Sequence, residues 1–148
     1  MWLLVQRRIQ SRSVLRKKHI VQDATCQVCN ASEETPDHII GGCAIAVSFW
    51  KRLNLNSMVG IQHQNLPSVT PSPGILVDEF PAFLALACWE IWKLRNAKVF
   101  RQENVSAVQL LSRCKSAAQL WSHGFSAKKR HIPQSWCSYF QMARNLLL

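Results

Sequence analysis

Apolar residues recur with the period of an α-helix through most of the second half of the chain. The clearest helix is predicted to begin after Ser106, because Ser106-Ala-Val-Gln109 has the pattern of a capping box, and to end at Gly124. Its apolar positions follow one another at helical spacing: Ala107, Leu110, Leu111, Cys114, Ala117, Ala118 and Trp121. We therefore expect a mainly α fold.

A second long helix is predicted from about Ala82 to Arg101. Its first turns are apolar on nearly every side and should be buried, and they contain Phe83, Leu84, Leu86 and Trp89. Its later turns carry several cations and should be amphipathic. Two such helices joined by a short turn predict an antiparallel helical hairpin with an apolar seam over residues 82–125.

Shorter helices are predicted in the first third of the chain. Trp2, Val5 and Ile9 fall on one face of a helical turn, and Ser11 is a suitable N-cap for the next helix. A further helix is expected over residues 44–53. We interpret residues 1–53 as one small helical module.

Two segments lack a clear helical period. Residues 54–81 are rich in proline and glycine and predict a flexible linker or long loop between two helical halves. Residues 126–148 form a basic and aromatic tail, to which we assign nothing beyond a last helix.

The charge of the chain points to polyanionic partners. Its 148 residues include 18 Lys and Arg against 8 Asp and Glu, a formal net charge of +10. The densest basic patch has cations four residues apart on one helix face, with further lysines beside them: Arg8, Arg12, Arg16, Lys17 and Lys18. This face predicts phosphate contacts to RNA or DNA, and an ordinary solvated helix face is the alternative of about equal weight.

The chain is expected inside the cell. It shows no signal peptide and no apolar run of the ~20 residues that a membrane span needs, so we expect neither secretion nor a membrane partner. The short basic run Lys128-Lys-Arg-His131 suggests the nucleus. In that setting the six cysteines should be thiols or metal ligands, and Cys88 and Cys114, on apolar faces, should pack in the core.

The other cysteines suggest a metal site. Cys26, Cys29, His38 and Cys43 have the spacing C-x2-C-x8-H-x4-C, and three sulfurs and one imidazole suit tetrahedral Zn²⁺. A set of four protein ligands leaves no open position for a substrate, which makes such a site structural. Thr35-Pro36 predicts a helix start that places His38 in its first turn. The alternative, buried thiols and a surface histidine, does not explain why all four residues fall so close together.

The same stretch resembles a known family. Trp2-Leu-Leu-Val-Gln-Arg-Arg-Ile-Gln-Ser11, Cys26-Gln-Val-Cys29, His38-Ile-Ile40, Cys43 and Trp50 resemble the zinc-binding module of plant LINE-type (non-LTR) retrotransposon polyproteins. Residues 89–100 are similar to the segment that follows that module. The resemblance covers about residues 2–53 and 86–125, and it implies that the four residues above are the zinc ligands.

The sequence also differs from the family's pattern at several points. Met1 falls just inside the start of the module, so we expect a truncated polyprotein, and the tail after about Ser126 does not match the family. Gly41-Gly42 replaces bulkier residues and should loosen Cys43. The carboxylates of the reverse transcriptase and of the ribonuclease H have no counterpart here, so we expect no enzyme.

The sequence is compatible with three functions. The favoured one is a non-catalytic zinc-binding module that contacts RNA or DNA. The second is a helical protein-interaction fragment, or a retroelement relic without function. The third, an enzyme, is disfavoured because three of the eight acidic residues lie in the cysteine and histidine segment and none has the context of a phosphate-handling site. The oligomeric state does not follow from the sequence.

Overall fold

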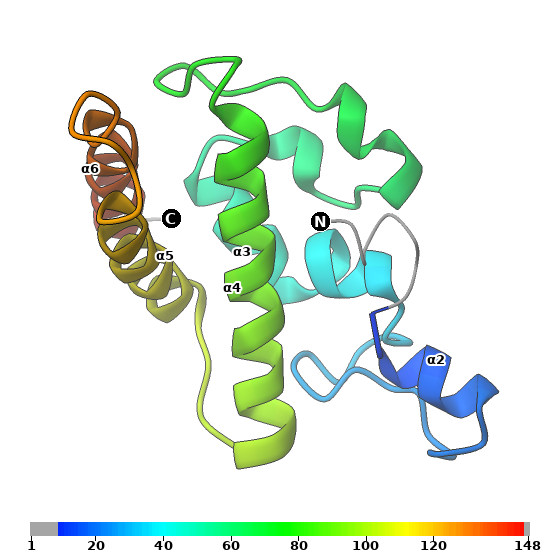
Figure 1. Ribbon diagram of the computed structural model, residues 1–148. Coiled ribbons are helices and arrows are strands. Elements are labelled where there is room, and N and C mark those ends of the chain that lie inside the picture. Colours follow the sequence, from blue (N-terminus) through cyan, green and yellow to red (C-terminus); the bar gives the residue numbers. More distant parts are fainter. Residues whose placement is uncertain (1–8, 147–148) are drawn as a thin grey trace.

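The computed structural model describes residues 9–146, and these residues are mainly helical (Figure 1). The order of elements is α2 (Arg12–Lys17), η1 (His38–Gly42), α3 (Ala44–Arg52), η2 (Asn56–Met58), η3 (His63–Ser68), α4 (Phe80–Arg101), α5 (Ala107–Ser122) and α6 (His131–Asn145). An isolated antiparallel β-bridge joins Thr25 and Glu33. The predicted turn carrying Trp2 and Val5 lies outside the described residues. The expected mainly α fold is confirmed.

Local capping explains where several helices begin. The Ser11 hydroxyl accepts a hydrogen bond from the Val14 amide at 3.4 Å, and the Ser106 hydroxyl accepts one from the Gln109 amide at 3.1 Å. Both serines satisfy a backbone donor that the first helical turn leaves free. Gln102, with φ of 54°, ends α4 in the left-handed conformation. The predicted N-caps are therefore confirmed.

The burial of α4 differs from the prediction at one position. Phe83, Leu84 and Leu86 are buried as expected, but Trp89 is 53% exposed. In its place Glu90 turns inward, where Lys93 and Arg113 neutralise its carboxylate at 2.6 and 3.5 Å. A carboxylate with two cationic partners can thus occupy an inward-facing position of the helix, next to a tryptophan that we had expected to be buried.

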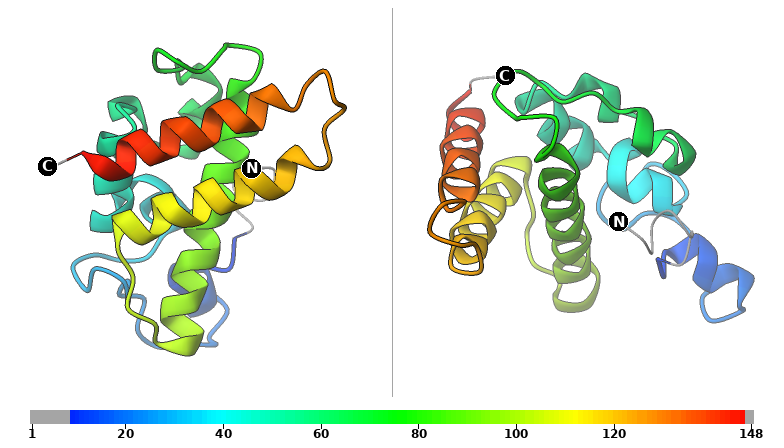
Figure 2. Two further views of the ribbon diagram at one scale, coloured as in Figure 1. Left: turned by 90° about the vertical axis from the view of Figure 1, so that its left-hand side faces the viewer. Right: turned by 45° about the horizontal axis from the view of Figure 1, so that its top comes forward.

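The helical hairpin of the second half is formed mainly by α5 and α6. We had paired the helix of residues 82–101 with that of residues 107–123, but α5 packs more extensively against α6 than against α4. Figure 2 shows α5 and α6 running antiparallel, with α4 crossing them. The tail supplies the reason, because Trp136 of α6 is fully buried and its ring centre lies 6.4 Å from that of Trp121 of α5.

The region of residues 54–81 packs on the rest of the chain. It is a long loop interrupted by η2 and η3, and its apolar side chains Leu55, Met58, Leu66 and Ile75 belong to the same buried cluster as α3 and α4. Tyr139 of α6 also donates a hydrogen bond to the Leu53 carbonyl. One core therefore connects the N-terminal module with the helices that follow it. Within residues 9–146, no helix is both long and apolar enough to cross a membrane.

Candidate metal centre

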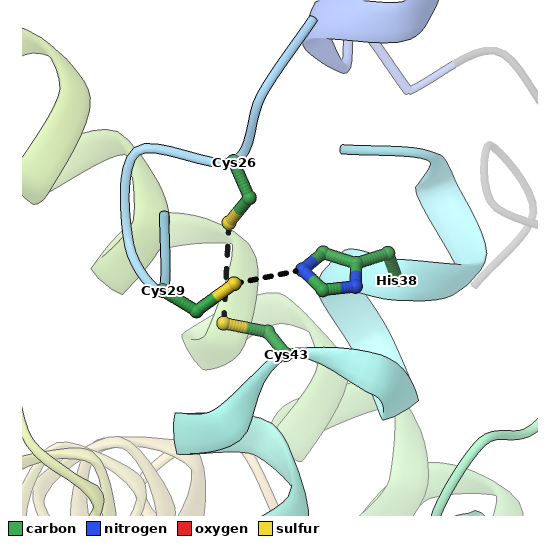
Figure 3. Close-up of side chains that lie close together, drawn as sticks. All are labelled: Cys26, Cys29, His38 and Cys43. Atoms are coloured by element: carbon green, nitrogen blue, oxygen red, sulfur yellow. Dashed lines mark hydrogen bonds between the residues drawn. The ribbon is translucent and has the colours of Figure 1, made fainter. Parts of the chain in front are cut away.

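Four side chains from three neighbouring segments converge on one point (Figure 3). Cys26 and Cys29 lie in the loop after α2, His38 begins η1, and Cys43 immediately precedes α3. All four ligand atoms lie within 4.8 Å of one another. The structure therefore brings together the residues that the spacing singled out.

A tight turn presents the two loop cysteines on the same side. The Cys26 carbonyl accepts a hydrogen bond from the Asn30 amide at 2.8 Å, and Asn30 adopts a positive φ of 56°. The Cys26 amide donates to the Ser32 carbonyl at 2.8 Å, which closes the turn. Asparagine tolerates the left-handed conformation better than most residues, so the local sequence favours this turn. We call the segment of residues 24–43 the knuckle.

His38 and Cys43 are positioned by a wide helical turn. The Thr35 hydroxyl accepts a hydrogen bond from the His38 amide at 3.0 Å, and Pro36 occupies the first helical position, as predicted. Five residues later the Cys43 amide donates to the His38 carbonyl at 2.7 Å, a π-helical bond. This wider turn, found often at functional sites, brings the imidazole and the last thiol to the same side.

The two glycines beside Cys43 fit tightly packed surroundings. A Cβ at Gly41 would lie 2.5 Å from the Met58 carbonyl oxygen, and the Gly41 carbonyl accepts a hydrogen bond from the Gly60 amide at 2.8 Å. A Cβ at Gly42 would lie 3.1 Å from Nδ1 of His38. Gly41 therefore lets the loop after α3 approach the backbone of η1. The loosening of Cys43 that we expected from these glycines stays a prediction.

The distances suit a tetrahedral zinc ion. Sγ of Cys26 lies 4.0 Å from Sγ of Cys43, and Sγ of Cys29 lies 3.4 Å from Nε2 of His38. Around Zn²⁺ with ordinary bond lengths, neighbouring ligand atoms are about 3.6 to 3.8 Å apart. The donors are three sulfurs and one imidazole nitrogen, which favour zinc over hard cations. The residues present therefore fit the ion.

The electrostatics of the four groups are mutually dependent. The hydrogen bond from Cys43 lowers the pKa of Cys26 to about 3, and the same contact, together with burial, raises the pKa of Cys43. The hydrogen bond with Cys26 raises the pKa of His38. The cluster thus stabilises a thiolate next to an imidazole, and a bound cation would replace the protons that these groups otherwise share.

A buried ion pair supports the knuckle, and sequence reasoning missed it. Glu34 stands in a polar stretch with Glu33 and Asp37, but its side chain is 0% exposed and forms a two-point contact with Arg95 of α4, at 2.6 and 3.1 Å. The same carboxylate accepts a hydrogen bond from the Arg12 amide at 2.8 Å. Glu34 therefore joins α2, the knuckle and α4. Its place among polar residues gave no signal of burial.

The predicted basic face is only partly free. The Nε of Arg12 donates to the Asp23 carbonyl at 3.1 Å, and Arg16 pairs with Glu33 at 2.7 Å. Lys17 and Lys18 are exposed, and Arg8 lies outside the described residues. Arg12 thus has a structural role that its spacing did not reveal.

Comparison with protein families connects this geometry with known proteins. Residues 1–50 match a family described as zinc-binding in reverse transcriptase, and all four converging side chains lie within the match. That family is a zinc-binding domain and not the catalytic part of the enzyme. No curated protein and no solved structure matched the chain.

Proposed function

We propose that this chain is a non-catalytic zinc-binding module derived from a retrotransposon polyprotein of the plant LINE type. The observation that carries the proposal is the convergence of Cys26, Cys29, His38 and Cys43 within a segment that matches a zinc-binding family. With four protein ligands, the ion would have no open position for a substrate, so its role is structural.

The bound ion would supply a cross-link between three segments of the N-terminal third of the chain. Cys26 and Cys29 hold the turn after α2, while His38 and Cys43 hold the two ends of η1. Because such a site does not exist in the unfolded chain, the free energy of zinc binding becomes free energy of folding. Zinc would thereby fix α2 against the rest of the protein.

The module is proposed to contact RNA or DNA through the α2 basic face, which we define as Arg16, Lys17 and Lys18 together with Arg8 and Arg12. Arg16 remains available for phosphate contacts despite its pair with Glu33. Both side chains are about half exposed (48% and 47%), and such pairs contribute little stability. Contacts of this type neutralise phosphates and read no sequence. The exposed run of Lys128, Lys129 and Arg130 is consistent with action in the nucleus.

The zinc site is tested by native mass spectrometry and circular dichroism with matched cysteine variants. One zinc per chain is expected, lost with a chelator together with part of the helical signal. Cys29→Ser should abolish zinc retention, whereas Cys137→Ser should not, although both thiols are partly buried. A chain that carries no zinc and keeps its spectrum after chelation would contradict the proposal.

The nucleic-acid contact is tested by the salt dependence of binding. The variant Arg16→Ala, Lys17→Ala, Lys18→Ala should weaken binding of single- and double-stranded probes alike and reduce the slope of log K against log salt by up to about 3. Arg12 is left in place because its side chain holds the loop at Asp23. An unchanged slope would refute the assignment of this face.

A further inference from the structure

An exposed stripe on α4 combines aromatic rings with a cation. Trp89, Lys93, Asn96 and Phe100 are spaced by four, three and four residues, which places them on one face of the helix. Trp89 is 53% exposed and Phe100 is 72% exposed. We call these four residues the α4 aromatic stripe. Trp89 and Phe100 therefore offer two exposed rings at the two ends of one helix face.

The ring of Phe100 has a fixed neighbour. The guanidinium of Arg95 lies 5.9 Å from the Phe100 ring centre and 5.0 Å from that of Trp92. Arg95 cannot move freely, because Glu34 holds it in the buried ion pair. Phe100 is therefore oriented by a cation on one side and remains open to solvent, which is the arrangement of a preformed stacking platform.

The charge around the stripe is positive. The only acidic residue within α4 is Glu90, whose side chain is 3% exposed and which contacts both Lys93 and Arg113. Two cations thus meet one carboxylate. Lys93 and Arg113 together exceed Glu90 by one positive charge, which favours an anionic ligand on this side of α4.

A groove of about 330 Å³ with a mixed polar and apolar lining runs beside the stripe, between α4 and α5. Ala117 and Leu120 are its apolar lining, and besides Glu90 its polar lining offers cationic, hydroxyl and amide groups: Lys93, Gln109, Ser112, Arg113 and Ser116. These groups can neutralise phosphates and donate hydrogen bonds to phosphate oxygens and sugars.

We propose that the α4 aromatic stripe binds single-stranded nucleic acid, with bases stacked on Trp89 and Phe100 and phosphates near Lys93 and Arg113. This inference extends the proposed function by adding a second surface of a different chemical kind. Eleven residues of helix span about 16 Å, the length of roughly five nucleotides at ~3.4 Å each. Duplexes, whose bases are already stacked, would not engage the rings.

The two surfaces are separated by α4 itself and by the knuckle. In both views α2 lies at one edge of the molecule, away from α5 and α6, while α4 runs between them (Figures 1 and 2). This separation allows the two contributions to be measured independently.

The test is fluorescence anisotropy with the zinc-loaded full chain and a labelled oligouridylate of about 12 nucleotides, against a duplex of equal length. The double variant Trp89→Ala, Phe100→Ala should weaken binding of the single strand by about tenfold or more, with little change for the duplex and in the salt slope. The matched control is Leu76→Ala, Val77→Ala, which removes apolar side chains that are 67% and 73% exposed in the loop before α4. The control should bind as the parent chain does.

The outcomes separate this inference from the proposed function. Binding lost in the α2 variant but unaffected by the aromatic variant would overturn the inference alone. Absence of binding to both probes would overturn the inference and the nucleic-acid contact of the proposed function. Self-association of the chain that disappears in the aromatic variant would also overturn it, in favour of a second copy. Ultraviolet cross-linking to a 4-thiouridine strand should yield adducts in peptides that contain Trp89 or Phe100.

Discussion

The six cysteines of the chain are divided equally between two regions that are stabilised in different ways. In the knuckle, Cys26, Cys29 and Cys43 face one another and a histidine. In the helices that follow, Cys88 and Cys114 are buried among apolar side chains, and Cys137 lies at the edge of α6. The same residue type would therefore serve as a metal ligand in one region and is a small apolar group in the other, and its neighbours decide which.

The comparison predicts that removing zinc should have the largest effect and that the effect should be local. After chelation, amide hydrogen exchange should accelerate in residues 24–43 and in α2, because their cross-link is lost. The amides of α5 and α6 should keep their protection, since these helices are held by packing around Phe140 and Trp136. Hydrogen-exchange mass spectrometry with and without chelator measures both regions at once. Equal loss of protection in the two regions would mean that zinc stabilises the helices as much as it stabilises the knuckle.

A substitution in the helical region should give the complementary result. Phe140→Ala removes a ring that is fully buried and stacked on Phe83, and should lower the free energy of unfolding by about 3 to 5 kcal/mol. Zinc stoichiometry in native mass spectrometry should stay at one per chain, because no ligand touches this ring. The exposed Met142→Ala on the same helix serves as the control and should change stability by less than about 0.5 kcal/mol.

The ion pair between the two regions tests how strongly they are connected. Glu34→Gln leaves Arg95 as a buried charge without its partner and should cost about 3 kcal/mol. If the pair mainly joins the two regions, the substitution should also speed the loss of zinc to a competing chelator. Adding Arg95→Met should restore part of the stability, because the unpaired charge is then removed. Urea unfolding of the two single variants and the double variant gives the coupling energy, and a value near zero would contradict a connecting role.

The knuckle was predictable from the sequence to a degree that the helical packing was not. Metal ligands of this spacing form a local pattern, and Ser11, Thr35 and Ser106 are caps whose partners lie three residues away. The pairing of α5 with α6 depends on contacts between residues far apart in the sequence. Because the tail lacks a long apolar repeat, its buried Trp136 and Phe140 did not stand out. Local patterns could therefore be predicted from the sequence, whereas contacts between distant segments could not.

The burial of charged residues was equally hard to predict from the sequence. Glu34 and Glu90 are nearly inaccessible, and both are buried because a cation from another part of the fold reaches them: Arg95 for Glu34, and Arg113 for Glu90. A sequence does not reveal such partners, since they are 61 and 23 residues away. The burial of Glu90 also accounts for the exposure of Trp89, because Glu90 occupies the inward position beside it.

The smallest effect predicted is an absence of change, at the cysteines of the helical region. Burial raises the pKa of Cys88 to about 12 and that of Cys114 above its usual range, so at pH 8 both remain neutral thiols. A raised pKa means less thiolate at any given pH, and the thiolate is the form that iodoacetamide attacks. Chelation removes the cross-link of the knuckle and should open Cys26, Cys29 and Cys43 to the reagent, whereas Cys88 and Cys114 should stay unmodified. Cys137, which is only partly buried, should react slowly both with and without zinc. Peptide mass mapping after timed alkylation distinguishes the six sites, and labelling of Cys88 and Cys114 on chelation alone would show that zinc also stabilises the helical core.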